Sequence, residues 1–568
     1  MAAPATLVDI LAHRAATRPN DRAYIFLTDQ GAEEASLTYA ELLARANALA
    51  AHLAAAAAPG ERALLVFPSG LEFVVALFAC FLSRLIAVPI MVPRRQSARD
   101  SSVSIVANCA PKLALTSAAL MARQDLVERF PGLTWMTIDG DGGDASSVNI
   151  APRADDIAFL QYTSGSTSDP KGVVITHRNL MVNEEMMRIS LRNSEHSTCV
   201  NWIPHFHDMG LVFGVLHPLY LGSTAVLMSP NAFMQRPHLW LHAISQYRAE
   251  AVAGPNFGYD LCVSRYRPEL MEGIDLSNWK VACCGAEPIR VETLRRFAET
   301  FAQHGFDSRA IYPCYGMAET TLQATGRKRG EGYGTRKLSR SALQTNRIEA
   351  PRDRTDTSEI VGCGRTVLDE RLVIVDPDSG ARLAAEQIGE ICVSGDTIAG
   401  AYWRNPDATE ATLRARLPGD DGVWLRTGDL GFLDESGELY VTGRIKELII
   451  VRGMNHYPQD IERSVQAAHP ALRQNGGAAF SVADERGEEQ LVVVQEVERT
   501  ERNKVDPKEI TGLIREAVTN DHEIYARHIV LIRPGTLPKT TSGKIQRGAV
   551  RTLWLEGRLS TLVAEAAA

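Results

Sequence analysis

The stretch YTSGSTSDPKG, residues 162–172, lies between two apolar segments, 157–160 and 173–175, that are typical of β-strands. Its hydroxyl side chains and glycines are dense enough to surround a polyphosphate with O–H and N–H donors, and Lys171 adds a positive charge. It is not a Walker A loop, because that motif ends in Gly-Lys-Ser/Thr and opens a helix. The pattern predicts a phosphate-binding hairpin, although on local grounds a plain polar hairpin remains an alternative.

Strand and helix patterns alternate outward from this hairpin along most of the chain. Residues 63–67 form an apolar run typical of a buried strand, residues 71–82 have the length of a helix, and residues 86–90 have the pattern of the next strand. This alternation predicts an α/β fold with mainly parallel sheets covered by helices. Because Arg84 and two prolines interrupt the apolar segment 71–92, we expect a helix, turn and strand there, and no transmembrane segment.

Toward the C-terminal end of the chain the sequence pattern changes. Residues 373–440 contain short strand patterns separated by turn signals, which indicates a small β-rich subdomain. The residues beyond 444 are numerous enough for a separate α+β domain. The segment 326–359 is rich in Arg, Lys, Ser, Thr and Gly with little apolar periodicity, so we expect an exposed insertion.

Composition excludes several classes of protein. A chain of 568 residues requires two or more domains, and a net charge of −8 provides no global attraction to nucleic acid. The nine cysteines are an odd number and form no Cys-x-x-Cys pair, which favours reduced thiols over a disulfide framework. Residues 1–20 lack the basic and apolar pattern of a signal peptide, so we expect a cytoplasmic protein.

Three further clusters suit a nucleotide. Residues 285–288, Gly-Ala-Glu-Pro, follow an apolar run and place a backbone of low bulk at a strand end, where a flat base can lie. Residues 315–320 combine an aromatic face, a carboxylate and a hydroxyl, which suit adenine, Mg²⁺ and phosphate. Asp429, after Arg-Thr-Gly, is able to accept hydrogen bonds from ribose hydroxyls. Each cluster is a weak signal by itself.

In this order, these clusters resemble the adenylate-forming superfamily of acyl-CoA synthetases, luciferases and peptide-synthetase adenylation domains. Residues 443–447, GRIKE, resemble its hinge motif, and residues 538–545, PKTTSGKI, resemble its C-terminal catalytic-lysine motif. The resemblance covers nearly the whole chain. It implies a large N-terminal domain over residues 1–443, a hinge at 444–446 and a mobile C-terminal domain over residues 447–568.

The resemblance also implies roles for individual residues. Lys544, Glu319 and Thr320 would be catalytic, with Glu319 holding Mg²⁺, Thr320 contacting the α-phosphate and Lys446 serving as the swivel point. The predicted ATP-binding residues are Thr163, Ser164, Gly165, Ser166, Thr167, Lys171, Gly285, Ala286, Glu287, Pro288, Tyr315, Gly316, Met317, Ala318, Asp429 and Arg444. The required cofactors would be ATP and Mg²⁺, with no tightly bound organic cofactor.

The chemistry agrees with these roles. A carboxylate substrate is already ionised at pH 7, so its attack on the α-phosphate needs no general base. The site has to overcome the repulsion between two anions, hold them in line and stabilise the leaving pyrophosphate. A lysine and a metal ion achieve this electrostatically.

Within the superfamily, three segments closely resemble the fatty acyl-AMP ligases: residues 204–211, 253–262 and 452–462. The long spacing between Glu319 and residue 362 matches an insertion that this family carries and that is associated with poor use of coenzyme A. The implied partners are a fatty acid and the phosphopantetheine arm of an acyl carrier protein. The acyl-binding candidates are His207, Asp208, Gly210 and Phe257.

Several alternatives stay open at this point. The chain would otherwise be a fatty acyl-CoA synthetase or, in another class, a catalytically silent nucleotide-binding protein of the same fold. Residues 205–208 also have a weak zinc-site pattern, and residues 211–216 are equally consistent with a tunnel lining or a core helix. The basic residues of the insertion are either a solvated loop or a docking surface for an acidic carrier protein, namely Arg327, Lys328, Arg329, Arg336, Lys337 and Arg340.

Overall fold

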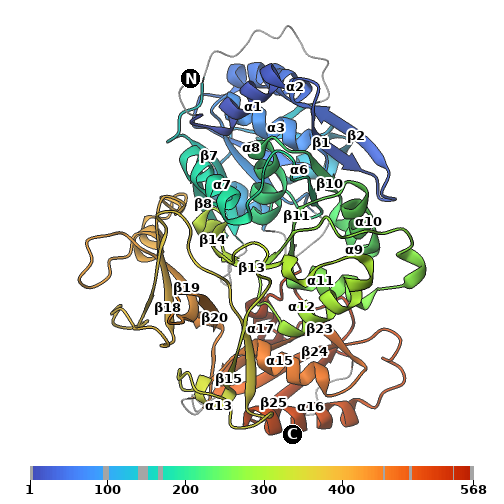
Figure 1. Ribbon diagram of the computed structural model, residues 1–568, viewed down its shortest axis with the longest axis vertical. Helices are drawn as coiled ribbons and strands as arrows, with labels where there is room; N and C mark the ends of the chain where they lie inside the picture. Colours follow the sequence, from blue (N-terminus) through green and yellow to red (C-terminus); the bar gives the residue numbers. More distant parts are fainter. Residues whose placement is uncertain are drawn as a thin grey trace.

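The computed structural model describes residues 4–93, 101–138, 151–163, 170–451, 454–484, 489–540 and 543–562. Two large sheets and their helices form the upper part of the molecule, the β-rich subdomain lies to one side, and the C-terminal domain lies below (Figure 1). Among the described residues, no helix is both long and apolar enough to cross a membrane. The predicted α/β architecture is confirmed.

The first large sheet has the strand order β14-β13-β12-β11-β9-β10-β1-β2 and is parallel except at its two ends. Its strands are β1 (Arg22–Leu27), β2 (Glu33–Thr38), β9 (Cys199–Asn201), β10 (Ala225–Met228), β11 (Ala251–Pro255), β12 (Val281–Gly285), β13 (Ile311–Gly316) and β14 (Gln323–Gly326). Parallel strands end at one common edge, so the segments that follow β12 and β13 meet there.

The second sheet has the order β6-β5-β3-β4-β7-β8, and only its last pair is antiparallel. Its strands are β3 (Arg62–Val66), β4 (Ile86–Ile90), β5 (Leu113–Thr116), β6 (Thr134–Thr137), β7 (Ile157–Thr163) and β8 (Lys171–Thr176). The strands predicted at 63–67 and 86–90 are therefore present, and the helix predicted between them is α3 (Leu71–Leu82). α3 is buried on almost every side because it contacts strands of both sheets.

Helices cover the two sheets. In the first part of the chain they are α1 (Leu7–Thr17), α2 (Tyr39–Ala56), α4 (Ser102–Cys109), α5 (Ala118–Met121) and α6 (Gln124–Arg129). Those after the phosphate hairpin are α7 (His177–Leu191), α8 (His217–Leu221), α9 (Pro230–Gln235), α10 (His238–Gln246), α11 (Asn256–Ser264) and α12 (Val291–Phe301). α7 starts directly where β8 ends, because Thr176 and Asn179 form a reciprocal capping box.

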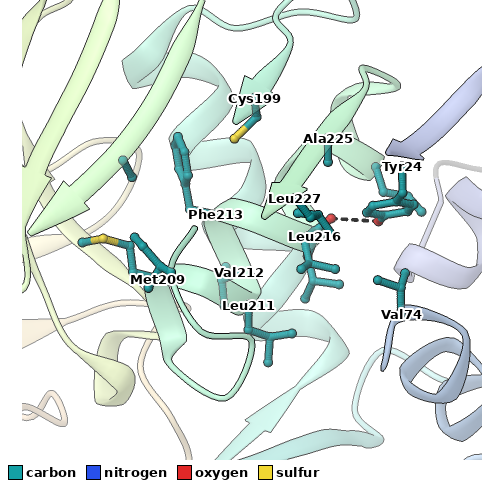
Figure 2. Packing of buried hydrophobic residues seen from close by; sticks show 14 of the residues in the cluster. Tyr24, Val74, Cys199, Met209, Leu211, Val212, Phe213, Leu216, Ala225 and Leu227 are labelled. Carbon is teal, nitrogen blue, oxygen red and sulfur yellow. Dashed lines mark hydrogen bonds between the residues drawn. The ribbon is translucent and has the colours of Figure 1, made fainter. Parts of the chain in front are cut away.

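Residues 211–216 belong to the core. They lie in η1 (Met209–Leu216), a π-helical segment in which every residue is buried. Figure 2 shows Leu211, Val212 and Leu216 in the packed interior, where the Tyr24 hydroxyl donates to the carbonyl oxygen of Val215 at 2.8 Å. Of the two interpretations of this segment, the core helix is the one that the structure supports.

The β-rich subdomain and the C-terminal domain have the predicted character. The first is a four-stranded antiparallel sheet of β17 (Arg371–Val375), β18 (Gly389–Ser394), β19 (Leu425–Leu433) and β20 (Leu439–Arg444). The second joins β23 (Leu472–Ala483), β24 (Glu489–Val497) and β25 (Ala526–Ile532) to α15 (Pro458–Ala467), α16 (Pro507–His522) and α17 (Arg547–Leu555). A hairpin of β21 (Ile449–Val451) and β22 (Met454–His456) leads into it. Its hydrophobic cores are separate from the N-terminal core.

The insertion is less exposed than predicted. β15 (Thr335–Ser339) and β16 (Thr357–Val361) form an antiparallel pair, and α13 (Arg340–Leu343) follows β15. Leu338 and Leu343 are buried against Phe432, Tyr440 and Tyr457. The apolar residues that anchor the insertion are few and widely spaced, so they produce no period that sequence inspection detects.

The basic residues of the insertion are mostly paired within the chain. Arg327 contacts Glu438 at 2.7 Å and Arg336 contacts Glu386 at 2.7 Å, while Arg329 pairs with Glu250. Two further members of the set are also engaged, because Lys328 lies 3.3 Å from Glu331 and Arg340 donates to the carbonyl oxygen of Asp521 at 3.1 Å. Five of the six basic residues therefore have partners within the chain, and the docking surface for a carrier protein stays a prediction.

Candidate active site

The phosphate hairpin is the antiparallel pair β7–β8, in which Thr163 lies opposite Lys171 at the open end. Lys171 places its Nζ 4.8 Å from the ring centroid of Tyr402. The predicted ligands Ser164, Gly165, Ser166 and Thr167 lie outside the described residues. Of the predicted ligands in this motif, the structure thus describes the positions of Thr163 and Lys171.

The two glycine-containing clusters meet at the edge of the first sheet. β12 ends at Gly285 and β13 ends at Gly316, so residues 285–288 and 315–318 follow adjacent parallel strands. A Cβ atom at Gly316 would lie 1.8 Å from the carbonyl oxygen of Leu322, and one at Gly285 would lie 3.0 Å from that of Cys314. A side chain is excluded at Gly316 and would be tight at Gly285, so both positions favour glycine.

Asp429 joins this edge to the β-rich subdomain. The Tyr315 hydroxyl donates to its Oδ2 at 2.8 Å, and Nε of Arg444 donates to its Oδ1 at 2.6 Å. The pair is set by register, because Asp429 on β19 faces Arg444 on β20. The charge of Asp429 raises the pKa of Arg444 above its ordinary value. Three residues predicted to contact the nucleoside are thereby brought together.

Glu319 lies in a short turn, η5 (Ala318–Thr320), directly after β13. The Tyr402 hydroxyl donates to its Oε1 at 2.8 Å, and its backbone carbonyl accepts from the N–H of Ala399 at 2.9 Å. Burial raises the pKa of Glu319, while the hydrogen bond from Tyr402 opposes that shift. Within the described part of the chain, its second carboxylate oxygen has no side-chain partner.

The hydroxyl of Thr320 is surrounded by backbone groups of its own turn, and its predicted contact with the α-phosphate stays a prediction. Its side chain is fully buried, and its hydroxyl accepts from the N–H of Met317 at 3.1 Å. The same hydroxyl lies 2.9 Å from the carbonyl oxygen of Met317 and 3.2 Å from that of Leu322, either of which can accept its proton. These backbone partners would have to be exchanged before the hydroxyl could contact an α-phosphate. The geometry favours a residue that shapes the turn.

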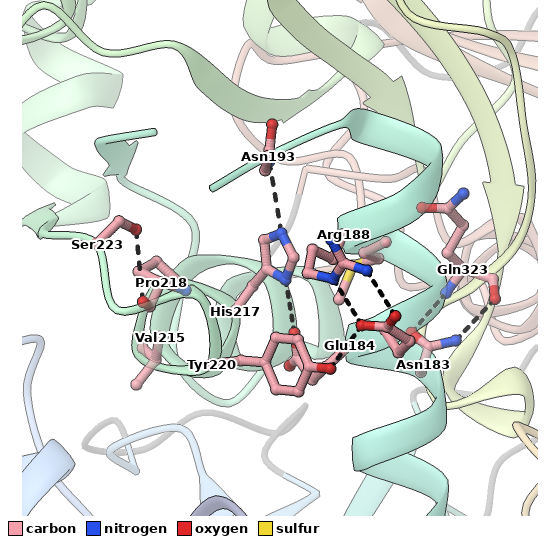
Figure 3. A network of polar contacts seen from close by, with 12 residues as sticks. Asn183, Glu184, Arg188, Asn193, Val215, His217, Pro218, Tyr220, Ser223 and Gln323 are labelled. Carbon is pink, nitrogen blue, oxygen red and sulfur yellow. Dashed lines mark hydrogen bonds and ion pairs between the residues drawn. The ribbon is translucent and has the colours of Figure 1, made fainter. Parts of the chain in front are cut away.

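Two asparagines of α7 were not identified from the sequence. Asn183 donates to the carbonyl oxygen of Gln323 at 2.9 Å (Figure 3), and Asn179 donates to that of Ile398 at 3.1 Å. One helix therefore fixes both the turn that carries Glu319 and the loop that leads to Tyr402. In the sequence, these asparagines are marked only by their spacing of four residues after a Thr cap. Many ordinary helices show the same pattern, so it does not indicate a functional role.

The acyl-binding candidates lie beside this site. Nδ1 of His207 is 2.6 Å from Oδ1 of Asp208, and the backbone N–H of Phe257 donates to Glu287 at 2.6 Å. Burial alone would raise the pKa of Asp208, but the neighbouring His207 and Lys544 outweigh it and lower that pKa to about 2. A Cβ atom at Gly210 would lie 2.1 Å from the carbonyl oxygen of Pro204, so only glycine fits there.

The zinc pattern of residues 205–208 is not supported as a ligand set. His205 stacks on Phe73 with ring centroids 4.9 Å apart, and its Nε2 accepts from the N–H of Gly70 at 3.2 Å. The ring is therefore part of the packing. Within the described ranges, no group of three or more His, Cys, Asp or Glu side chains is arranged to hold a metal ion.

Lys544 reaches this site from the C-terminal domain. Burial lowers the pKa of Lys544, and the charges of Asp208, Glu287 and Asp429 oppose that shift, while Arg444 adds to it. Asp208, Glu287 and Asp429 belong to the part of the chain before the predicted hinge, and Arg444 is the first residue of that hinge. The C-terminal domain is therefore docked in an orientation that brings its lysine to the nucleotide side of the site.

Contacts around Lys544 maintain this orientation. Asn475 donates to Oδ2 of Asp260 at 3.1 Å, and Nζ of Lys539 donates to the carbonyl oxygen of Asn475 at 2.5 Å. Gly543 packs so closely on Phe257 that a Cβ atom would lie 2.6 Å from its ring. Residues far apart in the sequence thus build the two sides of one site.

Comparison with known proteins identifies the family. Residues 11–403 match the family of AMP-binding enzymes, and residues 446–564 match the AMP domain of Disco-interacting protein 2-like proteins. The medium-chain-fatty-acid–[acyl-carrier-protein] ligase JamA of Moorena producens (strain JHB) is 41% identical, across 98% of this chain and 96% of JamA. The crystal structure of the fatty acyl-adenylate ligase from L. pneumophila in complex with acyl adenylate and pyrophosphate is 38% identical with a TM-score of 0.77, and the match covers 99% and 97% of the two chains.

The chain belongs to the fatty acyl-AMP ligases of the AMP-binding family. The resemblance inferred from its motifs is confirmed. A relative of this ligase has a different name: the putative fatty-acid–CoA ligase fadD25 of Mycobacterium tuberculosis (strain ATCC 25618 / H37Rv) is 36% identical, across 98% of this chain and 99% of fadD25.

Proposed function

We propose that this ligase activates a fatty acid with ATP and then transfers the acyl group to the phosphopantetheine thiol of an acyl carrier protein in the cytoplasm. The packing of Gly543 on Phe257 carries the proposal, because the backbone N–H of Phe257 is bonded to Glu287 and the neighbouring Lys544 is thereby brought to the edge of the first sheet that carries the nucleotide-binding clusters. The name of JamA, a medium-chain-fatty-acid–[acyl-carrier-protein] ligase, supports both the substrate and the acceptor, and that of the L. pneumophila fatty acyl-adenylate ligase supports the acyl-adenylate.

In the first step, a carboxylate oxygen of the fatty acid attacks the α-phosphorus of ATP. A new P–O bond forms, the bond to the β-phosphate breaks, and pyrophosphate leaves with the electron pair. Lys544 stabilises the charge that develops between the two anions. Lys171 and residues 163–167 hold the β- and γ-phosphates, Tyr315 and residues 285–288 enclose adenine, and Asp429 and Arg444 hold the ribose.

The residues around Glu319 fit a magnesium ion. Mg²⁺ is commonly held by one or two carboxylates together with the phosphates of the substrate and water. Glu319 offers one such carboxylate, since Tyr402 occupies only one of its two oxygens. When bound, the ion neutralises phosphate charge and stabilises the leaving pyrophosphate. Glu319 orients this ion, and Thr320 holds the turn on which Glu319 lies.

In the second step, the carrier-protein thiol attacks the acyl carbonyl carbon and AMP leaves. We propose that the C-terminal domain swivels at Lys446 between the two steps, with residues 1–443 and 447–568 as the two domains. The contacts on each side of Lys446 support this hinge. Arg444 pairs with Asp429 of the N-terminal part, whereas Glu447 pairs with Arg547 of the C-terminal domain at 2.6 Å.

The acyl acceptor distinguishes this function from that of an acyl-CoA synthetase. The insertion, which resembles the one associated with poor use of coenzyme A, contacts the C-terminal domain, since the N–H of Asn455 donates to the carbonyl oxygen of Gln344 at 2.8 Å. We expect carboxylic acids of graded chain length to release pyrophosphate, and the acyl group to appear on a carrier protein but not on coenzyme A. Acyl-CoA formed at a comparable rate would favour the synthetase, and absence of pyrophosphate release with every acid would favour a silent nucleotide-binding protein.

Asn475 offers a test of the docked orientation, in which the C-terminal domain brings Lys544 to the nucleotide side of the site. It has a φ of +53°, so glycine keeps the backbone and removes only the side-chain bond to Asp260. A net hydrogen bond is worth about 1 kcal/mol, so Asn475→Gly is expected to slow adenylate formation by about fivefold. Transfer from supplied acyl-adenylate to the carrier protein should be unchanged. Equal slowing of both half-reactions would contradict an effect on the adenylation orientation.

A further inference from the structure

Tyr402 lies on a loop that joins the two halves of the phosphate-binding region. Its backbone pairs with Val173 of β8 as an isolated antiparallel bridge, and the N–H of Trp403 donates to the carbonyl oxygen of Gly172 at 2.7 Å. The N–H of Tyr402 donates to the Thr409 hydroxyl at 3.0 Å. This segment is thus added to the edge of the phosphate hairpin, although it lies more than 200 positions further along the chain.

The side chain of Tyr402 contacts two residues of the proposed ATP site. Its hydroxyl donates to Oε1 of Glu319 at 2.8 Å, and its ring lies against Nζ of Lys171, which is 4.8 Å from the ring centroid. A lysine at this distance from an aromatic face is attracted to it by a cation–π interaction. The residue is 4% exposed, so packing holds its side chain in place. No other contact in the described site joins Lys171 to Glu319.

We propose that Tyr402 is a positioning residue that sets Glu319 and Lys171 in the relative arrangement needed to bind ATP together with its magnesium ion. The inference rests on the proposed function. The hydroxyl holds one oxygen of Glu319 and leaves the other available as a ligand. The ring restrains a lysine side chain that otherwise has four freely rotating bonds, so less conformational entropy is lost when the phosphates bind.

The test separates the hydroxyl from the ring. Tyr402→Phe removes only the bond to Glu319, and its affinity for ATP is measured by calorimetry with excess Mg²⁺ and again with EDTA, without fatty acid. Partners that orient metal ligands typically contribute about 10- to 100-fold to metal affinity or activity. We expect affinity for ATP with Mg²⁺ to fall by about 10-fold or more and affinity for metal-free ATP to be unchanged.

A matched control is available in the same chain. Tyr220 donates its hydroxyl to Glu185 at 2.7 Å, a bond of the same kind outside the proposed site. Tyr220→Phe should leave both affinities unchanged. Tyr402→Leu removes the ring as well, so its affinity for metal-free ATP should also fall, because Lys171 loses its restraint.

The outcomes are decisive in both directions. Three results would overturn the proposed role of the hydroxyl. Tyr402→Phe would lose the same affinity for ATP with Mg²⁺ and for metal-free ATP, or it would lose no affinity for either. Alternatively, Tyr220→Phe would lose as much affinity as Tyr402→Phe. Metal-free ATP bound normally by Tyr402→Leu would overturn the role of the ring. These measurements use ATP alone, so they succeed or fail independently of whether a fatty acid is activated and of which acceptor receives it.

Discussion

Replacing Lys544 with alanine is expected to abolish most acyl-adenylate formation while leaving ATP binding largely intact. Removal of one preorganised charge that acts on a transition state typically costs on the order of 10²–10³ in rate. The segment that carries Lys544 packs on Phe257, and the charges of Asp208, Glu287 and Asp429 act on the lysine there, where the carboxylate and the α-phosphate would meet. The base, the ribose and the outer phosphates depend on other residues, so the affinity for ATP should change little.

Trapping of the acyl-adenylate by hydroxylamine measures this step directly, and calorimetry measures ATP binding. Lys504→Ala is a suitable control, because Lys504 belongs to the same domain but is exposed and pairs with Glu501 at 3.1 Å. Unchanged hydroxamate formation in Lys544→Ala would refute the assignment. Loss of ATP binding in the same variant would instead indicate that Lys544 contributes mainly to the ground state.

The second large effect is expected for Asp429→Ala. Hydrogen bonds to a charged group contribute about 1.5–3 kcal/mol, which corresponds to about 10- to 100-fold in affinity. In this variant the Tyr315 hydroxyl also loses its buried acceptor and Arg444 loses its counter-charge. We therefore expect the KM for ATP to rise by about 100-fold.

Asp429→Asn separates charge from shape. The amide has nearly the same size and retains one oxygen acceptor, so we expect a smaller rise in the KM for ATP than in the alanine variant. Steady-state pyrophosphate release at varied ATP concentration gives the values. A KM for ATP within twofold of that of the unaltered ligase in Asp429→Ala would show that the carboxylate does not contact the nucleotide.

The elements that could be predicted from sequence are those with a strong local pattern. The run at 63–67 and the long apolar segment at 71–82 became β3 and α3, because strand and helix length and burial are encoded within a few residues. The insertion was the clearest failure. Leu338 and Leu343 are buried only because Phe432 and Tyr440, about 90 positions later, complete the same cluster.

The motif residues of the candidate site could be proposed from sequence because several clusters, each weak by itself, occur in the order that one superfamily shows. Tyr402, Asn179 and Asn183 were missed for a different reason. Each is a single polar or aromatic residue in an ordinary context, and its relevance arises from a contact with Glu319, Ile398 or Gln323. A contact between distant segments leaves no local pattern.

The sequence by itself determined the alternation of strands and helices, the order of the motifs and the presence of a lysine near the end of the chain. These depend on the periodicity and chemistry of neighbouring residues. Only the tertiary structure decided that the segment carrying Lys544 packs on Phe257, that the Thr320 hydroxyl lies within hydrogen-bond distance of backbone groups, and that the insertion is partly buried. Each of these depends on how separately folded parts pack against one another, and the energy of that packing is shared among residues hundreds of positions apart.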